Sequence, residues 1–400
     1  MTKQRVLIVN KFYYPRGGDC VCTLNLEKLL GEHGHGTAVY AMDYPDNIDS
    51  QWSAYFASQV SFGGSPKALF NAMKRTLGMG DIKQSFNRIL ADFRPDVVHL
   101  NNIHSYLSPV LAELAKKAGA QVVWTLHDYK LICPSYSCTC NGLPCEKCFT
   151  DKWNVISQRC MKGSLAASFI AWIEAVKWNK KKLEQHVDKF ICPSHFMYTK
   201  MAQAGFDESK LTVLCNFVDP VKLATLSSSV GSDRNSDTYC YIGRLSSEKG
   251  ISQLLETASK LPQYRFMVAG DGPLGEQLRA EFASYGNIHF LGRLGAEDVT
   301  RLLSSSTASI IPSRWYENNP LGVIESLCAG TPVIGARIGG IPELIDDSCG
   351  VTYAWDNADE QRDAIIAAMT TKWNNSKISN ESISRFSPEA HYKELIKVYV

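Results

Sequence analysis

The sequence lacks a long apolar run: no stretch approaches the ~20 apolar residues that a membrane-spanning helix needs. Residues 1–9 read directly into a short strand pattern, which is too brief for a secretion signal and has no cleavage site. The composition lacks extremes as well, with 45% apolar and 20% charged residues. These absences exclude disordered and fibrous classes, and we expect a globular cytoplasmic protein.

The net charge is also small, at +2, but it is unevenly distributed. Residues 1–215 contain 25 Lys and Arg against 18 Asp and Glu, whereas the remainder contains 17 against 22. A basic first half is typical of a surface that meets an anionic lipid or a phosphate-bearing ligand, although chance produces the same asymmetry.

The 400 residues exceed one ordinary core and predict two domains. Short Val, Ile and Leu runs alternate with segments of helical period, and this alternation occurs twice. Such runs predict strands buried on both faces of parallel sheets, with helices as crossovers. The expected strands are 5–10, 37–42, 97–100, 121–127 and 189–194, then 238–244, 264–270, 288–292, 308–312 and 332–336.

We therefore predict an α/β fold with two doubly wound, Rossmann-like domains that face each other across a cleft. The first domain is expected over 1–215, a linker over 216–237 and the second domain over 238–385. A C-terminal helix within 386–400 is expected to pack back on the first domain. Ligands of such sheets bind outside the carboxyl ends of the strands, so functional residues should follow strands directly.

The most informative segment is 311–325, which follows an expected strand and opens a helix that ends near Ala329. Its loop N–H groups and the helix N-terminus suit a phosphate. Glu317 in the loop and Glu325 in the helix can reach different parts of one ligand. A bare pair of glutamates would also fit two solvated helix-end side chains.

A second segment, 241–250, also lies between a strand and a helix. Arg244 and Lys249 are five residues apart and are flanked by Gly243 and Gly250. Arg offers a planar fork and Lys a mobile point charge, so together they can bracket a diphosphate. An exposed basic turn is the alternative.

Glu317 and Glu325, with the turn and strand at 329–335, resemble the signature of the family-four retaining glycosyltransferases, whose fold is of the GT-B type. In that family the first Glu lies beside the transferred sugar and the second hydrogen-bonds the nucleotide ribose. The residues matching Arg244 and Lys249 stabilise the charge on the departing nucleotide, in place of a metal. The resemblance thus implies metal-independent catalysis and a nucleotide-sugar-binding second domain.

The resemblance also implies roles in the first, acceptor-side domain. His127 ends a strand, and the family His there contacts the sugar near its reacting carbon, so we assign it to positioning and polarisation. The Gly17-Gly18 loop faces the phosphates and acceptor in the family, and it is not the Gly-x-Gly-x-x-Gly fingerprint of dehydrogenases. His104 also follows a strand and is expected to line the acceptor side.

The implied catalytic residues are Glu317, His127, Arg244 and Lys249. The implied sugar-donor-binding residues are Gly17, Gly18, Gly243, Asn318, Asn319, Pro320, Leu321, Gly322, Glu325, Gly292 and Asn216. At the last of these the family usually has Asn-Gly, and here Phe217 replaces the glycine.

Six of the 13 cysteines crowd into the loop 133–160. In a reducing cytoplasm such a cluster indicates metal more than disulfides. Cys145 and Cys148 have the spacing of a tetrahedral thiolate site. A subset of the resembling transferases has a similar loop, matched by Cys133, Cys145, Cys148 and Cys160, which implies a structural zinc site without a chemical role. Cys138 and Cys140 are then surplus or alternative ligands. An iron–sulfur cluster and free thiols are the alternatives.

Segments 65–75 and 169–182 are basic and amphipathic, which is typical of a membrane interface and also of core-facing helices with solvated lysines. If the contact is with a membrane, the acceptor is lipid-linked and the protein works at the inner face of the cell membrane.

The resemblance implies a retaining hexosyl- or N-acetylhexosaminyl-transferase. It would move sugar from a UDP- or GDP-linked sugar donor to a glycan or polyprenyl-linked acceptor, in cell-surface polysaccharide synthesis. We expect no nucleic-acid partner. A nucleotide-sugar isomerase or phosphorylase on the same fold, or a catalytically inactive paralogue that only binds, are the rival interpretations.

Overall fold

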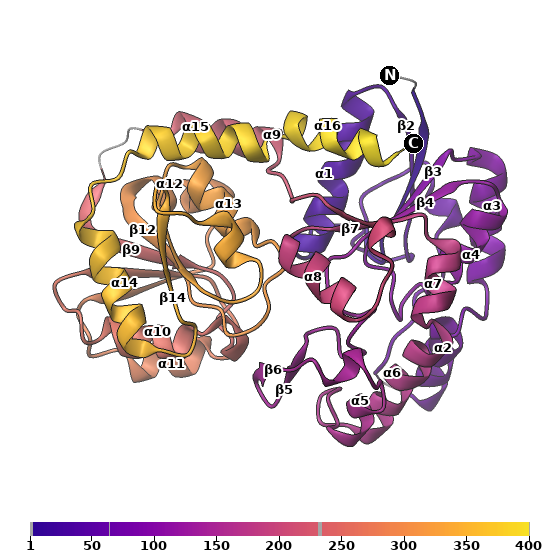
Figure 1. The fold of residues 1–400 in the computed structure, drawn as a ribbon, viewed down its shortest axis with the longest axis horizontal. Coiled ribbons are helices and arrows are strands. Elements are labelled where there is room, and N and C mark those ends of the chain that lie inside the picture. Colours follow the sequence, from indigo (N-terminus) through magenta and orange to yellow (C-terminus); the bar gives the residue numbers. More distant parts are fainter. Residues whose placement is uncertain (1–2, 64, 231–233, 400) are drawn as a thin grey trace. The chain divides into compact units, whose positions relative to one another are not determined.

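The computed structural model describes residues 3–63, 65–230 and 234–399, which fold into two compact units (Figure 1). Unit 1 comprises Met1–Cys140, Cys145–Cys215 and Tyr392–Val400, and unit 2 comprises Asn141–Pro144 and Asn216–His391. None of the helices in the described parts of the chain combines the length and apolarity needed to cross a bilayer.

Unit 1 is built on a parallel six-stranded sheet in the order β2-β1-β3-β4-β7-β8. The chain leaves β1 toward β2 and returns to β3 on the other side, so the strand order reverses between β1 and β3. The strands are β1 (Arg5–Val9), β2 (Gly36–Tyr40), β3 (Val97–Leu100), β4 (Gln121–Thr125), β7 (Lys189–Cys192) and β8 (Leu211–Val213). The main helices are α1 (Gly18–Glu32), α2 (Pro66–Thr76), α3 (Ile82–Phe93), α4 (Val110–Lys117), α6 (Leu165–Lys177), α7 (Lys180–His186) and α8 (His195–Gln203).

Unit 2 has a second parallel six-stranded sheet, in the order β11-β10-β9-β12-β13-β14. Its order reverses between β9 and β12. The strands are β9 (Asn235–Ile242), β10 (Arg265–Ala269), β11 (Ile288–Gly292), β12 (Ser306–Ile311), β13 (Val333–Ala336) and β14 (Gly350–Tyr353). The helices are α9 (Pro220–Ser228), α10 (Ile251–Ala258), α11 (Gly275–Glu281), α12 (Ala296–Ser305), α13 (Leu321–Cys328), α14 (Ala358–Thr370) and α15 (Asn375–Phe386), followed by α16 (Pro388–Val398).

The ten strands expected from apolar runs are all present, and both sheets are doubly wound, as predicted. The two edge strands β8 and β14 were missed. The first has only three residues, and the second begins with Gly350 and contains Thr352, so neither forms a continuous apolar run.

The expected linker over 216–237 needs correction, because helix α9 occupies 220–228 and packs against α12, α13 and α15. The Asp219 carboxylate accepts from the N–H groups of Val221 and Lys222, and Pro220 stands in the first turn, which is a strong helix start. The serine-rich stretch extends into 231–233, which lies outside the described residues.

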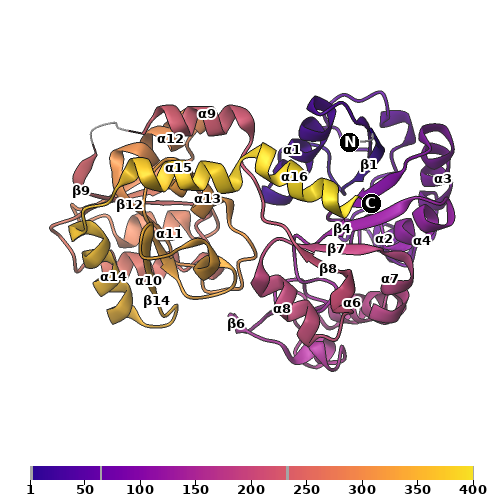
Figure 2. The ribbon, with the colours of Figure 1, turned by 45° about the horizontal axis from the view of Figure 1, so that its top comes forward.

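The last turns of α16 make their contacts with unit 1 (Figures 1 and 2). The ring of Tyr392 stacks on His33 with centroids 3.6 Å apart. Gln121 Nε2 donates to the carbonyl of Val398 at 2.8 Å, and Gln4 Nε2 to that of Tyr399 at 3.1 Å.

Candidate functional site

In unit 2, the loops that follow β9 and β12 leave the same edge of the sheet, where the strand order reverses. Such a reversal opens a crevice that serves as the ligand site of doubly wound sheets. The two loops touch, since the Arg314 N–H donates to the carbonyl of Glu248 at 2.9 Å. Arg244 and Lys249 belong to the first loop, and Glu317 belongs to the second.

Glu317 is the centre of this contact and is only 9% exposed. Its Oε1 accepts hydrogen bonds from Lys249 Nζ at 2.6 Å, Ser313 Oγ at 2.7 Å and Trp315 Nε1 at 2.9 Å. Burial raises the pKa of this carboxyl, but the Lys249 charge and these hydrogen bonds outweigh it, so the pKa of Glu317 lies below its ordinary value. The structure therefore holds a carboxylate and an ammonium in contact at the crevice.

Two glycines let the backbone approach this pair closely. A Cβ on Gly250, whose φ is +70°, would lie 2.0 Å from the carbonyl oxygen of Pro312. A Cβ on Gly339, whose φ is +61°, would lie 2.2 Å from the Glu317 carbonyl, which accepts from the Gly340 N–H at 2.7 Å. The position of Glu317 thus depends on Gly250 and Gly339, because any residue with a Cβ at either position would be strained.

Asn216 and Asn319, both assigned to sugar-donor binding from the sequence, lie in contact. The Asn216 N–H donates to Asn319 Oδ1 at 2.9 Å, and Asn216 Nδ2 donates to the Asn319 carbonyl at 3.0 Å. Glu325, on α13, pairs with Lys222 of α9 at 2.5 Å. Lys222 was missed because its helix was taken for a linker, although Asp219-Pro220 signalled that helix.

The remaining unit 2 candidates lie along the same edge of the sheet. Arg244 is exposed, and its carbonyl accepts from the Tyr241 hydroxyl at 2.7 Å. Gly243 lies against Gly270, where a Cβ would stand 1.9 Å from the Gly243 carbonyl. Gly292 ends β11, two strands from β9, and its carbonyl accepts from the Gly270 N–H at 2.7 Å. Residues 318–322 lead into the first turn of α13.

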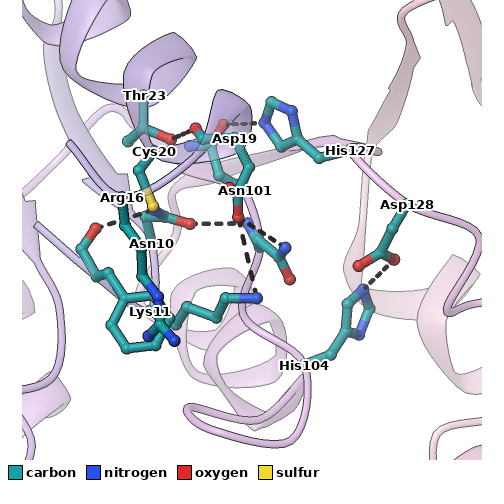
Figure 3. A network of polar contacts seen from close by, with 12 residues as sticks. Asn10, Lys11, Arg16, Asp19, Cys20, Thr23, Asn101, His104, His127 and Asp128 are labelled. Carbon is teal, nitrogen blue, oxygen red and sulfur yellow. Dashed lines mark hydrogen bonds and ion pairs between the residues drawn. The ribbon is translucent and has the colours of Figure 1, made fainter. Parts of the chain in front are cut away.

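In unit 1, the corresponding edge gathers the loops that follow β1, β3 and β4 (Figure 3). The Lys11 N–H donates to the Asn102 carbonyl, and the Asn102 N–H donates to Asn10 Oδ1, each at 3.1 Å. Asn102 Nδ2 donates to Asp19 Oδ2 at 2.8 Å. These contacts link the first turn of α1 to the crevice between β1 and β3.

His127 lies in this network, with its Nε2 2.9 Å from Asn101 Oδ1 (Figure 3). Asn101 Nδ2 lies 3.4 Å from the Val9 carbonyl and 3.5 Å from that of His99, an arrangement in which Oδ1 is the atom that accepts from His127 Nε2. Burial lowers the pKa of His127, although Asp19 and Asp128 oppose that shift. A neutral ring with Nδ1 as an acceptor follows.

Asp19 was not singled out from the sequence, although it directly follows the Gly17-Gly18 pair. Burial raises the pKa of Asp19, but the Lys11 charge and the hydrogen bond from Asn102 outweigh this effect, so the pKa lies below its ordinary value. Lys11 Nζ is 3.9 Å away. A Cβ on Gly18 would meet nothing within 4 Å, so this end of α1 is open space beside a carboxylate.

His104 is buried beside this network, and its ring stacks on Trp124 with centroids 5.1 Å apart (Figure 3). Its Nε2 lies 3.9 Å from Asp128 Oδ1. Burial lowers the pKa of His104 to about 3, against an ordinary 6.5, with Glu174 opposing and Lys130 assisting the shift.

This shift predicts acid sensitivity. Below pH 6.5 His104 binds a proton in the unfolded chain but stays neutral in the folded protein. The free energy of unfolding therefore falls by about 1.4 kcal/mol per pH unit down to about pH 3. The melting temperature should therefore drop more between pH 7.5 and pH 5.5 in the wild type than in His104→Gln. Parallel drops in the two proteins would contradict this assignment.

The expected zinc ligands are only partly brought together. Hydrogen bonds from Cys138 and then Cys148 lower the pKa of the Cys133 thiol, so these three sulfurs are neighbours, whereas Cys160 is hydrogen-bonded to Cys140. Within the described residues no group of three or more His, Cys, Asp or Glu side chains is arranged to hold a metal ion. A structural zinc at Cys133, Cys145, Cys148 and Cys160 therefore stays a prediction.

Two family models match consecutive parts of the chain. The model described as Glycosyltransferase Family 4 matches residues 16–222, and the model described as Glycosyl transferases group 1 matches residues 224–385. A protein of Klebsiella pneumoniae, described as an uncharacterized 42.6 kDa protein in the cps region, is 27% identical over 354 residues, covering 85% of this chain and 87% of the relative.

Solved structures with the same fold include sucrose-phosphate synthase from Thermosynechococcus elongatus, with a TM-score of 0.69 and 16% identity over 99% of this chain and 98% of the other. Anabaena HepE in complex with UDP-glucose has a TM-score of 0.64 and 16% identity, with 99% of each chain covered. These identities show the fold alone, and that fold is the GT-B type expected from the sequence.

Proposed function

Because the chain belongs to Glycosyltransferase Family 4, we propose that it moves a sugar from a UDP- or GDP-linked sugar donor onto a glycan or polyprenyl-linked acceptor, with retention at the anomeric carbon. The transferred group is a hexosyl or N-acetylhexosaminyl residue, and the product belongs to cell-surface polysaccharide synthesis. We place the reaction on the cytoplasmic side of the cell membrane. The relative described as lying in a cps region supports the assignment to polysaccharide synthesis.

The observation that carries the proposal is the Lys249–Glu317 contact at the point where the strand order of unit 2 reverses. A nucleotide-sugar has a diphosphate that needs cations and sugar hydroxyls that need acceptors. Lys249 and the exposed Arg244 supply the cations, and the N–H groups at the start of α13 add donors to the phosphates. Glu317, ionised by its surroundings, accepts from the sugar hydroxyls.

The two other assignments follow from position. Glu325 holds the ribose, in exchange for its contact with Lys222. Asn216 fixes the backbone at Asn319, and so orders the loop 318–322 that faces the sugar. The HepE structure, which is a complex with UDP-glucose, supports a sugar donor of this class for the fold.

In the reaction, negative charge develops on the departing nucleotide as the anomeric bond breaks. Arg244 and Lys249 stabilise that charge, which is the electrostatic task given to metals elsewhere. The transferred sugar passes through an oxocarbenium-like state, and the acceptor attacks from the face that the leaving phosphate vacates. The phosphate oxygen takes the acceptor's proton, so no carboxylate nucleophile is required.

Unit 1 contributes the acceptor side. Neutral His127 polarises a sugar hydroxyl through its Nδ1, and its ring is oriented by Asn101. Asp19, held ionised by Lys11, accepts from a second hydroxyl of the acceptor near the open space at Gly18, while the reacting hydroxyl gives its proton to the phosphate. Exclusion of water from the reacting centre protects the sugar donor from hydrolysis.

A screen of nucleotide-sugars by thermal stabilisation tests the proposal. The right sugar donor at 100 times its dissociation constant should stabilise the folded protein by about 2.7 kcal/mol, because it binds only the folded state. A matched nucleoside monophosphate and free sugar serve as controls. The hit is then incubated with lipid-linked acceptors, and the anomeric configuration of the product is read by NMR.

The other outcomes of the screen would each support one of the alternative functions. No stabilisation by any nucleotide-sugar would favour a binding paralogue without activity. A changed nucleotide-sugar in the absence of an acceptor would favour an isomerase. A sugar phosphate that forms only when inorganic phosphate is added would favour a phosphorylase.

A further inference from the structure

Helix α6 (Leu165–Lys177) turns its apolar side outward. The side chains of Leu165, Phe169 and Val176 are 54%, 45% and 48% exposed. The residues it buries are instead Ser168, Ala171 and Glu174. A surface helix of a globular protein normally buries its apolar stripe, so this helix has the opposite polarity.

Polar contacts fix this orientation. The Glu174 carboxylate lies 3.1 Å from Lys130 Nζ, in an ion pair whose side chains are 7% and 5% exposed. It also accepts from the N–H and the hydroxyl of Ser105, both at 2.8 Å. Rotating α6 to hide its apolar side would remove Glu174 from Lys130. A buried Lys130 charge without its partner costs free energy. The outward face is therefore a stable feature of unit 1.

The outward face is aromatic at its centre, where Trp172 is half-buried against a small cluster of Cys148, Val155 and Ile156. Leu165, Phe169, Trp172 and Val176 follow one another at spacings of four, three and four, which places them on one side of the helix. The rings of Phe169 and Trp172 stack with centroids 5.8 Å apart, and Trp153, which is 50% exposed, meets Trp172 edge-on at 5.4 Å. We call these five residues the α6 face. An exposed apolar patch of this kind marks an interaction site.

The charge around the α6 face is mostly positive. Between Asp151 and Lys182 the chain has seven Lys and Arg residues and two acidic ones, Glu174, which is already paired, and Asp151, whose carboxylate accepts from the Trp153 N–H. Among the seven, Lys180 and Lys181 are exposed on the next helix, α7. The segment expected as one amphipathic helix over 169–182 is in fact broken here, because Asn179 caps the start of α7.

Helix α2 lies beside α6 in both views (Figures 1 and 2) and extends this character. Trp178 Nε1, directly after α6, donates to the carbonyl of Thr76 at the end of α2, at 2.9 Å. Phe70 on α2 is 55% exposed, with Lys74 Nζ 4.5 Å from its ring centroid.

We propose that the α6 face docks on an anionic lipid surface. Its aromatic and aliphatic side chains enter the boundary between headgroups and acyl chains, while the surrounding lysines meet lipid phosphates. Interfaces between proteins are enriched in aromatic residues but depleted in lysine, so the lysine surround favours lipid over a protein partner. This docking is independent of the sugar-transfer chemistry in unit 2.

Flotation of the full chain with vesicles tests the proposal. Vesicles of phosphatidylethanolamine with a third phosphatidylglycerol should carry the wild type, and pure phosphatidylcholine vesicles should not. The variant Leu165→Ser/Phe169→Ser/Val176→Ser should bind at least about tenfold more weakly. It keeps Trp172, which packs on the small buried cluster of Cys148, Val155 and Ile156.

A charge variant and matched controls separate the two contributions. Lys180→Gln/Lys181→Gln should weaken binding roughly tenfold at low salt and less at high salt. Val221→Ser, which alters a 66% exposed apolar residue on α9, and Lys260→Gln/Lys372→Gln in unit 2 should bind like the wild type. All variants should keep the wild-type melting temperature and the same stabilisation by a nucleotide-sugar, which distinguishes a failure here from a failure of the proposed reaction.

Three results would overturn the proposal. They are equal binding to neutral and anionic vesicles, full binding by the triple serine variant, and absence of vesicle binding by the wild type. In the last case, self-association that the triple variant abolishes in sedimentation would assign the face to a second copy of the chain.

Discussion

Replacement of Glu317 by alanine is expected to lower kcat/KM for sugar transfer by at least about a thousandfold, which corresponds to about 4 kcal/mol of transition-state stabilisation. The carboxylate does two tasks: it accepts from the sugar and it holds Lys249 through a 2.6 Å contact. Its loss also leaves the donors of Ser313 and Trp315 without their acceptor. Initial rates with the sugar donor found in the thermal screen provide the measurement.

A change in folding must be separated from a change in chemistry. Loss of a buried acceptor costs about 1–3 kcal/mol of stability, so the melting temperature of Glu317→Ala should fall modestly while the protein stays folded. Glu317→Gln keeps the shape and an acceptor oxygen, and should retain the stability better than the activity. Glu281→Gln, an exposed carboxylate on α11, should match the wild type in both. A folded Glu317→Ala enzyme that transfers sugar at the wild-type rate would refute the site.

The predicted unit 2 site rests on local patterns, namely the spacing of Glu317 and Glu325 and the pair of cations, Arg244 and Lys249. The sequence did not predict which of these side chains contact one another. Lys249 and Glu317 are 68 positions apart, and their contact depends on β9 and β12 being neighbours in the sheet. That neighbour relation follows from the crossovers and is invisible to a window of a few residues.

Other residues were missed for different physical reasons. Trp315 is an indole donor to Glu317, but an aromatic residue in a loop gives no signal of its acceptor. Lys222 was hidden by the serine-rich composition of the stretch that follows it. Asp19 has a meaning only through Lys11 and Asn102, which the sheet brings from two other loops.

The α6 helix shows the same limit most clearly. Its sequence has an apolar stripe, and a stripe predicts a buried face. The buried contacts of Glu174 with Lys130 and Ser105, which come from other segments, determine that this stripe points outward. A pattern thus predicts that a face exists, and tertiary contacts decide which way it points.

Substitution of Lys249 by glutamine should lower kcat about a hundred- to a thousandfold, because one cation that stabilises the departing nucleotide is lost. The sugar donor's KM should change much less, since Arg244 and the start of α13 still bind the phosphates. Lys249→Arg should not restore the rate: the guanidinium is planar and larger, and the ammonium here fits between the Glu317 carboxylate and the Trp315 ring, 5.2 Å from its centroid. Separate kcat and KM values give the answer.

A double-mutant cycle distinguishes stabilisation of the transition state from simple positioning. If Lys249 acts on the leaving group while Glu317 orients it, Lys249→Gln/Glu317→Gln should lose less activity than the two single losses combined, since each removes part of the same unit. Additive losses would mean that the two residues act independently, despite their contact. An increase in KM at constant kcat in Lys249→Gln would assign the lysine to ground-state binding of the diphosphate. Arg244 alone would then stabilise the charge on the departing nucleotide.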